Sequence, residues 1–406
     1  MSKKRLLILI SSLNFGGAQR IAAQISELLS NEWEVTFLLN GKENIAFPVK
    51  AKIIDLGIVP PKDKENIMYQ LKVFLRRYSQ VKKLKKSGDF TACLSFMDSA
   101  HVINILTGRK NTKTVLQIVN TMSVAKRNKL KIRLIVSPLI KLLYNKASLI
   151  IAQSDAMKDD LVKNFNIKES LVTTINSAID FNELKQNLSS PLPEEDHKWF
   201  SKDLTVVTAG RMEYQKGHWH LIRAFSEVIK EVPDAGLVIF GSGTLRDSLS
   251  ELILKMGLEK NILLHSPSPY LEAYYASSAV FAFPSIFEGF GIAMQEALAC
   301  GIPCVSSDYQ SGARELLGYD KNDEKITEVT LCPYGIITPA FYYDEQTRLS
   351  DLTDTNITKE EKLFAKALLM VLTDSKLKED LRQKSLMRGQ DFDSEKIRLL
   401  WEKALS

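Results

Sequence analysis

Apolar runs of strand length recur along this chain and alternate with segments of helical periodicity. Such runs span residues 5–11, 204–208, 236–240 and 280–283, and glycine-containing turns follow them. Continuous apolar runs of this length are typical of parallel strands buried on both faces. Because the alternation fills both halves of the chain, the sequence predicts an α/β protein with two doubly wound, Rossmann-like domains. With 406 residues and 45% hydrophobic content, the chain is long enough to bury two cores.

A polar stretch at residues 182–202, which contains two prolines and an acidic triplet, suggests a connection between the domains. We therefore expect an N-terminal domain over residues 1–180 and a C-terminal domain over residues 181–391. Residues 392–406 form a final helical segment. That segment can pack on its own domain or on the first one.

Two glutamates mark the segment after the strand 280–283. Glu288 follows the strand directly, and Glu296 falls two turns into an expected helix over 292–300. If that helix forms, the two carboxylates are separated by roughly 12 Å along it. A carboxylate accepts paired hydrogen bonds from vicinal hydroxyls, so this span suits a ligand such as a sugar nucleotide. An ordinary amphipathic helix with Glu296 on its wet face explains the same pattern.

Two cations follow the strand 204–208, close to the start of the next helix. Gly210 permits close approach of the backbone, and Arg211 and Lys216 come next in the chain. Cations at a strand end beside a helix N-terminus are how an open α/β sheet binds a diphosphate. The glycine turn at Gly241, after the strand 236–240, fits the same sheet edge. A basic surface turn is the alternative reading.

Together these segments resemble the C-terminal domain of the GT-B glycosyltransferases, specifically the retaining group called family 4. The resemblance extends to the N-terminal turn SLNFGGAQR and to the short segments at 175–180 and 334–337. Within the family, the segments 13–20, 95–99 and 309–316 are similar to the PglH-type bacterial transferases, which extend lipid-linked oligosaccharides with N-acetylgalactosamine. The resemblance implies a GT-B fold, with two domains facing a cleft that holds the substrates and a last helix that crosses back to the first domain.

The resemblance also implies roles for the residues singled out above. Arg211 and Lys216 stabilise the leaving diphosphate of a UDP-sugar, Glu288 holds the donor sugar, and Glu296 holds the ribose. The donor-binding set is completed by glycines and backbone N–H groups, at Gly16, Gly17, Gly241, Gly289, Phe290 and Gly291. Because two cations neutralise the diphosphate, no metal and no cofactor is expected.

The chain departs from the family at one catalytic position. Many members carry a histidine just after the strand that here spans 114–119, whereas this chain has Asn120 there. An amide can hydrogen-bond a sugar hydroxyl, but it does not titrate near neutral pH. Asn120 is therefore the candidate at this position in place of a histidine.

The net charge of +6 is concentrated in the N-terminal domain. No acidic residue lies between Asp98 and Asp155, whereas ten cations do. Residues 68–86 predict a helix with a cationic side and one apolar stripe, the stripe comprising Ile67, Leu71, Phe74, Tyr78, Val81 and Leu84. With the amphipathic run 122–146, this helix suits an anionic membrane surface, at roughly 1 kcal/mol per engaged cation.

The basic segments have two alternative interpretations besides membrane binding. A solvated basic face explains the cations alone, and nucleic acid is disfavoured because the basic stretches lack a recognised nucleic-acid fold and spaced aromatic residues. By resemblance to the PglH type, the basic helix engages the diphosphate of the lipid-linked acceptor, through the candidates Arg76, Arg77, Lys82 and Lys83.

No apolar run reaches the roughly 18 residues that span a bilayer, and the N-terminus turns into a strand and helix rather than a cleavage site. We therefore expect a cytoplasmic protein, peripheral on the inner face of the cytoplasmic membrane. The four cysteines form no Cys-x-x-Cys pair, which favours reduced thiols in the core over a metal site.

The combined prediction is a bacterial retaining hexosyltransferase of surface polysaccharide or glycan biosynthesis. It moves N-acetylgalactosamine or another hexose from a UDP-sugar to an undecaprenyl-diphosphate-linked oligosaccharide. Two alternatives stay open at this point: a non-catalytic, membrane-associated GT-B scaffold, and a GT-B epimerase or phosphorylase.

Overall fold

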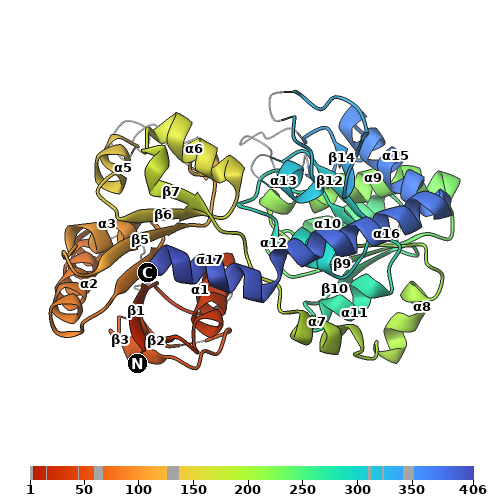
Figure 1. The fold of residues 1–406 in the computed structure, drawn as a ribbon. Helices are drawn as coiled ribbons and strands as arrows, with labels where there is room; N and C mark the ends of the chain where they lie inside the picture. The colour runs from red at the N-terminus through yellow and green to blue at the C-terminus, as the bar shows by residue number, and fades with distance from the viewer. Residues whose placement is uncertain are drawn as a thin grey trace. The chain divides into compact units, whose positions relative to one another are not determined.

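The computed structural model describes residues 3–14, 16–43, 45–58, 67–125, 137–309, 312–321, 324–341 and 352–406. The chain divides into two compact units. The first contains Met1–Ala178 and Ser394–Ser406, and the second contains Ile179–Asp393. Each unit holds one seven-stranded sheet with helices packed on it (Figure 1).

The first unit is built on a parallel sheet whose strands lie in the order β3-β2-β1-β4-β5-β6-β7. Its central strands are apolar on both faces, as in β4, where all five residues are buried. The strands are β1 (Lys4–Leu9), β2 (Trp33–Leu39), β3 (Lys52–Asp55), β4 (Ala92–Phe96), β5 (Lys113–Ile118), β6 (Leu149–Ala152) and β7 (Val172–Thr174).

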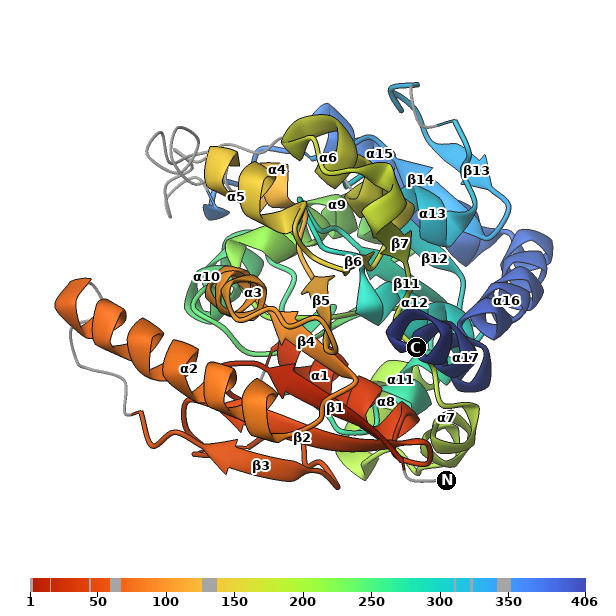
Figure 2. The same ribbon diagram turned by 60° about the vertical axis from the view of Figure 1, so that its left-hand side comes forward.

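The helices of the first unit pack in two sets. α1 contacts α17, while α3 contacts both α2 and α5; Figure 2 shows α2 as a long helix beside this sheet. The helices are α1 (Gly17–Leu28), α2 (Ile67–Ser87), α3 (Asp98–Leu106), α4 (Met122–Ala125), α5 (Ser137–Tyr144), α6 (Asp155–Phe165), the 3-10 helix η2 (Glu169–Leu171) and α17 (Ser394–Leu405).

The C-terminal helix α17 packs within the first unit through its buried side. Trp401 is buried, whereas Leu399 and Leu400 are exposed. The indole therefore anchors this helix, and the two leucines do not contribute to the core.

The second unit repeats the arrangement, with the strand order β10-β9-β8-β11-β12-β14-β13. All neighbouring strands are parallel except β13 and β14, which form an antiparallel edge. The strands are β8 (Thr205–Ala209), β9 (Gly236–Phe240), β10 (Ile262–His265), β11 (Val280–Phe283), β12 (Cys304–Ser307), β13 (Thr330–Cys332) and β14 (Gly335–Thr338).

Helices cover both faces of the second sheet and give it two cores. One core includes Trp219, Phe225 and Phe364, and the other includes Phe283 and Phe392. The helices are α7 (Phe181–Leu188), α8 (His197–Phe200), α9 (His218–Glu231), α10 (Arg246–Lys255), α11 (Leu271–Ala276), α12 (Ile292–Ala299), α13 (Ala313–Leu317), α15 (Lys359–Thr373) and α16 (Ser375–Gly389), with the 3-10 helices η3 (Glu194–Asp196), η4 (Tyr214–Lys216) and η5 (Gln390–Phe392).

The stretch 182–202, expected to be a polar connection, is largely helical and belongs to the second unit. It contains most of α7, together with η3 and α8. Buried Asp196 accepts a hydrogen bond of 2.7 Å from the Tyr274 hydroxyl on α11. Composition alone did not reveal this because the stretch is mostly polar and its packing depends on a distant tyrosine.

The cysteines are free thiols, as predicted. Cys93, Cys304 and Cys332 are buried, and Cys300 is half-buried. Burial raises the pKa of Cys93 to about 11, so this thiol is protonated at neutral pH.

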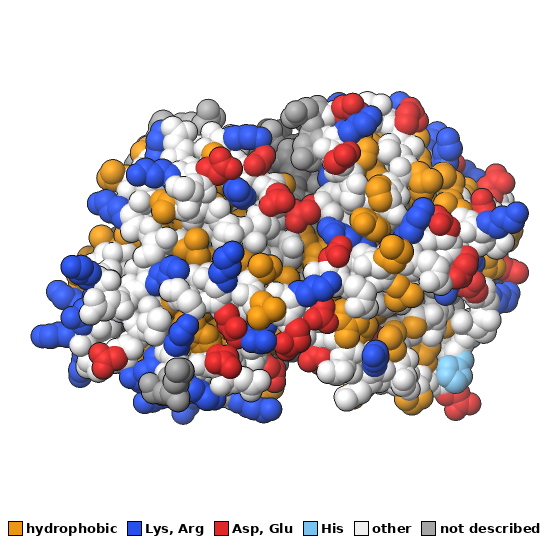
Figure 3. Space-filling view, in the orientation of Figure 1, with side chains coloured by type: hydrophobic (Ala, Val, Ile, Leu, Met, Phe, Trp, Pro, Cys, Tyr) orange, Lys and Arg blue, Asp and Glu red, His pale blue; other side chains and the backbone are white. Residues whose placement is uncertain are grey.

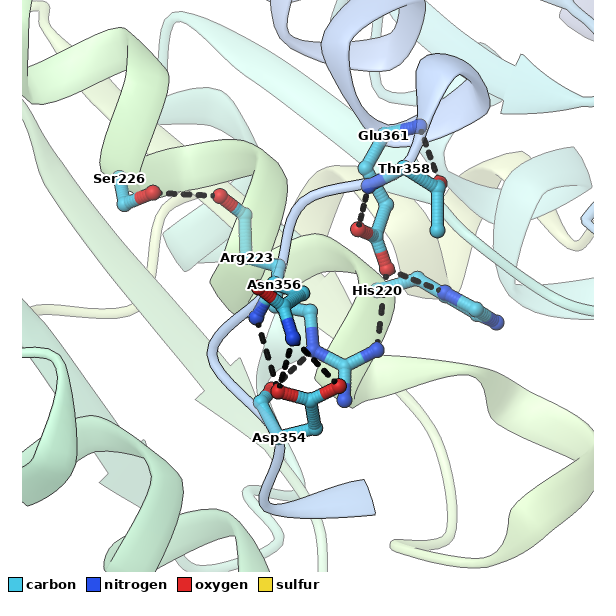
Figure 4. Close-up of polar contacts among 7 residues, drawn as sticks. All are labelled: His220, Arg223, Ser226, Asp354, Asn356, Thr358 and Glu361. Carbon is cyan, nitrogen blue, oxygen red and sulfur yellow. Dashed lines mark hydrogen bonds and ion pairs between the residues drawn. The ribbon is translucent and has the colours of Figure 1, made fainter. Parts of the chain in front are cut away.

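A buried polar cluster joins α9 to the start of α15 (Figure 4). Glu361 is fully buried; its Oε1 lies 2.6 Å from His220 Nδ1 and 3.3 Å from Arg223 Nη1. Glu361 also forms a capping box with Thr358, the N-cap residue of α15. Arg223 donates from Nε to the carbonyl oxygen of Asp354 over 2.6 Å. The Glu361 carboxylate thus joins the start of α15 to α9, and Arg223 joins α9 to the segment that precedes α15.

Candidate active site

The candidate site of the second unit lies where the strand order reverses direction. β8 and β11 are neighbours, and the crossover connections after them lead to opposite sides of the sheet. Loops diverge at such a switch point, which is where open α/β sheets bind their ligands. The segments 210–217 and 284–291 follow these two strands. The predicted residues Lys216 and Glu288 therefore meet at this edge.

The carboxylate of Glu288 is the centre of the site. Its Oε1 accepts hydrogen bonds from Lys216 Nζ at 2.6 Å and from Ser285 Oγ at 2.8 Å. Its Oε2 accepts one from Gln215 Nε2 at 3.0 Å. The Lys216 and Glu288 side chains are only 16% and 10% exposed, so their attraction is little screened by solvent. The Lys216 ammonium also lies 5.2 Å from the centre of the Phe283 ring.

The turn that presents Lys216 depends on a glycine. Gly217 has a φ of 62°, and a Cβ atom there would lie 2.3 Å from the carbonyl oxygen of Pro284. The backbone of Gln215 in η4 accepts a hydrogen bond of 2.9 Å from the N–H of Ile286. The two segments therefore pack backbone to backbone, which only a residue without a side chain permits.

A second glycine shapes the turn from Glu288 to α12. Gly291 has a φ of 102°. A Cβ atom at this position would lie 2.3 Å from the Tyr309 hydroxyl oxygen, so only glycine leaves room for that hydroxyl. That hydroxyl donates to the carbonyl oxygen of Phe290 at 2.7 Å. Within the described chain, α12 has no side-chain cap hydrogen bond and no acidic residue in its first turn. Its positive end is therefore suited to an oxygen-rich ligand.

The remaining donor-site candidates of this unit lie close to these turns in sequence. Glu296 is buried in the second turn of α12, so it does not lie on a wet helix face. Arg211 is exposed just after β8, and Gly241 follows β9, where its N–H donates to the His265 carbonyl oxygen at 3.0 Å. Gly289 is buried beside Glu288.

His218 begins α9, two residues after Lys216, and is almost completely buried. Burial, with a smaller contribution from the Lys216 charge, lowers the pKa of His218 to about 3. This imidazole is therefore neutral at physiological pH and adds no positive charge beside Lys216.

In the first unit, the predicted residues also lie at carboxyl ends of strands. Gly16 precedes α1 and Gly17 is its first residue. Within the described residues, this helix has no side-chain cap hydrogen bond and no acidic residue in its first turn. Asn120 is exposed after β5, where the family histidine was expected. His101 is buried on α3, with its Nδ1 3.0 Å from Ser95 Oγ.

Helix α2 carries the predicted acceptor-site cations on a surface that is also apolar. Arg76, Lys82 and Lys83 are exposed. Figure 3 shows Lys and Arg side chains gathered over the part of the first unit where Figure 1 places α2. Arg77 does not belong to this surface: it is buried, and its Nη1 donates to Ser99 Oγ on α3 at 3.1 Å. Burial lowers the pKa of the Arg77 guanidinium.

The apolar stripe of α2 is narrower than predicted. Phe74 and Leu84 pack against the core and Val81 is buried in it, but Leu71 is 48% exposed. Met68 and Leu75 are also exposed. Leu71 was included in the predicted stripe because apolar spacing on a helix does not say which face the rest of the protein covers. The amphipathic run 122–146 lies partly outside the described residues.

Across the described ranges, no group of three or more His, Cys, Asp or Glu side chains is arranged to hold a metal ion. Within the same ranges, no helix is both long enough and apolar enough to cross a membrane. The expectation that the reaction needs no metal stays a prediction.

The site can place one carboxylate and one ammonium group beside the positive ends of two helices, α9 and α12. That combination suits a ligand with hydroxyls and a diphosphate, because carboxylates accept from hydroxyls and cations neutralise phosphate. Two Rossmann-like units and this site define the GT-B class of glycosyltransferases.

Comparison with known proteins agrees with the assignment as a glycosyltransferase. Residues 15–183 match the model "Glycosyltransferase Family 4", and residues 192–326 match "Glycosyl transferases group 1". A Campylobacter jejuni enzyme, N-acetylgalactosamine-N,N'-diacetylbacillosaminyl-diphospho-undecaprenol 4-alpha-N-acetylgalactosaminyltransferase, is 30% identical over 97% of both chains. An uncharacterised glycosyltransferase of Methanocaldococcus jannaschii is 29% identical over 87% of both. The chain therefore belongs to glycosyltransferase family 4.

Solved structures show the same fold. HepE from Anabaena, in complex with UDP and glucose, has a TM-score of 0.71 at 17% identity and 99% coverage of both chains. Sucrose-phosphate synthase from Thermosynechococcus elongatus has a TM-score of 0.74 at 16% identity, with 99% of this chain and 98% of that chain covered. The predicted fold, the family resemblance and the assignment as a glycosyltransferase are confirmed.

Sequence reasoning missed two residues of the Glu288 cluster, Gln215 and Ser285. Both are neutral and polar, and neither a charge nor a glycine marks their positions in the sequence. A detectable signal was present: each precedes a charged site residue by one to three positions, within reach of the same strand end.

Proposed function

We propose that the protein transfers a hexose, with N-acetylgalactosamine as the leading candidate, from a UDP-sugar to a lipid-linked oligosaccharide, with retention at the anomeric carbon. The observation that carries the proposal is the 30% identity, over 97% of both chains, to an enzyme named for transferring N-acetylgalactosamine to a diphospho-undecaprenol glycan. The UDP and glucose bound in HepE support a uridine nucleotide as donor.

The site residues have distinct roles in this reaction. Breaking the glycosidic bond leaves negative charge on the diphosphate, and Lys216 and Arg211 neutralise it. An ammonium group has three donors, so Lys216 can hold Glu288 and still reach a phosphate oxygen. Glu288 holds hydroxyls of the donor sugar, and Glu296 holds the ribose.

Backbone N–H groups complete the proposed donor site. Those at Gly289 and Phe290 lie beside Glu288 in the chain, and Gly16 and Gly17 supply the open start of α1. Asn120 is proposed at the reaction centre. Exclusion of water during transfer would suppress hydrolysis of the donor.

The test is a panel of UDP-sugars supplied with a diphospho-undecaprenol glycan, with UDP release and the lipid-linked product both measured. We expect UDP release that requires the acceptor and one preferred UDP-sugar, and a product whose new linkage retains the anomeric configuration by NMR. Turnover of a nucleotide sugar without any acceptor product would contradict the lipid-linked proposal. An inverted linkage would contradict retention alone.

The acceptor side of the proposal places α2 on an anionic membrane surface on the cytoplasmic side. Exposed Met68, Leu71 and Leu75 supply apolar contacts, and Arg76, Lys82 and Lys83 supply charge. This combination of a basic polar face with exposed apolar side chains is typical of helices that lie in the membrane interface.

Removing three exposed positive charges from α2 should weaken membrane binding. Replacing Arg76, Lys82 and Lys83 with glutamine should lower the affinity for phosphatidylglycerol vesicles about a hundredfold, because each cation near an anionic surface contributes about 1 kcal/mol. Vesicle sedimentation at fixed ionic strength measures the change. A control variant with glutamine at three exposed lysines of α15 and α16, Lys362, Lys366 and Lys376, has the same net charge. An equal loss in both variants would indicate a general charge effect and no docking by α2.

A further inference from the structure

The Glu288 carboxylate accepts hydrogen bonds at both of its oxygen atoms, and a donor to Oε2 is the uncharged Gln215 side chain. We propose that Gln215 is a positioning residue for the donor sugar, acting through the Glu288 carboxylate. This inference rests on the proposed function, because it assumes that Glu288 receives sugar hydroxyls.

The two oxygens of Glu288 are anchored by different kinds of group. Oε1 accepts hydrogen bonds from Lys216 Nζ at 2.6 Å and from Ser285 Oγ at 2.8 Å. Oε2 accepts one from Gln215 Nε2 at 3.0 Å. The last torsion of a glutamate is broad and nearly two-fold, so anchoring one oxygen leaves the carboxylate plane poorly defined. A donor at the second oxygen sets that plane. Paired acceptance from two vicinal hydroxyls needs a defined plane.

Gln215 is itself held by the segment that carries Glu288. Its backbone carbonyl accepts the Ile286 N–H at 2.9 Å, and it lies in η4, directly before Lys216. The close contact between Gly217 and the Pro284 carbonyl oxygen ties the same two segments together. The backbone of Gln215 is therefore hydrogen-bonded to the segment that carries Glu288, and such support helps to orient a ligand-binding group precisely.

Lys216 and Gln215 have different roles in the proposed reaction because only Lys216 is charged. Lys216 must serve both the carboxylate and the departing diphosphate, so its hydrogen bond to Oε1 changes as the reaction proceeds. Gln215 carries no charge and does not bind the diphosphate in the proposed reaction. It keeps Oε2 in place while Lys216 responds to the developing charge.

The test separates binding of the sugar from binding of the nucleotide. Gln215→Met keeps the side-chain length and removes the donor. We expect kcat/KM for the preferred UDP-sugar to fall about tenfold, the effect of losing one hydrogen bond to a charged group. The inhibition constant of UDP, which has no sugar, should stay within twofold of wild type. Gln215→Glu should lose more activity than Gln215→Met, because it places a second carboxylate against Oε2.

Gln383→Met is the matched control. Gln383 makes the same kind of bond, donating to Glu379 at 2.8 Å on α16, but at an exposed position. Its kinetics should equal those of wild type. Thermal unfolding midpoints of all variants show whether the fold is kept.

Each other outcome overturns the proposal. If Gln215→Met and Gln215→Glu both turn over the donor like wild type, Glu288 needs no positioning by Gln215. If UDP and UDP-sugar weaken equally, Gln215 supports the turn and has no role specific to the sugar. If wild type itself turns over no nucleotide sugar, the proposed function fails, and this role fails with it.

Discussion

Replacing Lys216 with methionine should lower kcat for sugar transfer by at least a hundredfold. The ammonium lies 2.6 Å from Glu288 Oε1 in a site with little solvent exposure. In the proposed reaction, it is the less exposed of the two cations, Lys216 and Arg211, that neutralise the diphosphate as the glycosidic bond breaks. Removing one preorganised electrostatic group from an active site typically costs a factor of about 10²–10³ in kcat. Initial rates of UDP release at saturating donor measure the effect.

The control is Lys202→Met, the same chemical change in the same unit. Lys202 is exposed and pairs with exposed Asp234 at 3.3 Å, and surface pairs of this kind contribute little to stability. This variant should retain the wild-type rate. Retention of more than a third of wild-type kcat by Lys216→Met would show that this lysine does not assist departure of the leaving group.

Replacing Glu361 with alanine should destabilise the second unit by about 3–5 kcal/mol. The change removes the carboxylate that faces Arg223 at 3.3 Å and His220 at 2.6 Å, and it removes half of the capping box with Thr358. Arg223 is only 6% exposed, so its buried charge would lose the carboxylate that lies 3.3 Å from it. For a unit of this size, the unfolding midpoint should fall by about 10 °C.

Two further variants test the cause. Glu360→Ala changes the neighbouring, less buried carboxylate and should shift the unfolding midpoint by no more than about 2 °C. Arg223→Met combined with Glu361→Met removes both charges and should be more stable than Glu361→Ala, because the buried guanidinium is removed together with the carboxylate that faces it. If the double variant is the less stable of the two, the helix cap and packing carry the stabilisation and the ion pair does not.

The strand ends show why much of this site could be predicted. A continuous apolar run followed by glycine and a charged residue is a local pattern, and parallel strands bring such ends to one edge. The strand 236–240 and the start of α12 at Ile292 were therefore predicted to the residue. Gln215 was overlooked because nothing in its local pattern says that a carboxylate 73 positions later in the chain will accept from it.

Helix α2 shows the opposite case. Its periodicity predicted a helix, and the structure has one over Ile67–Ser87. Cations and apolar residues occur on several sides of it, so the pattern alone did not decide which side is covered. The packing of α3 turned Arg77 inward, and Leu71 was left exposed.

The amino-acid sequence therefore specified the features that arise from short-range physics: the strand and helix alternation, the glycine turns, and the charged residues at strand ends. Tertiary packing determined which side chains from distant parts of the chain contact one another. The strand order brought β8 beside β11, and only that neighbourhood joined Lys216, Gln215 and Ser285 around one carboxylate. Hydrogen bonds between segments far apart in the chain depend on how whole elements pack, and periodicity along the chain does not encode them.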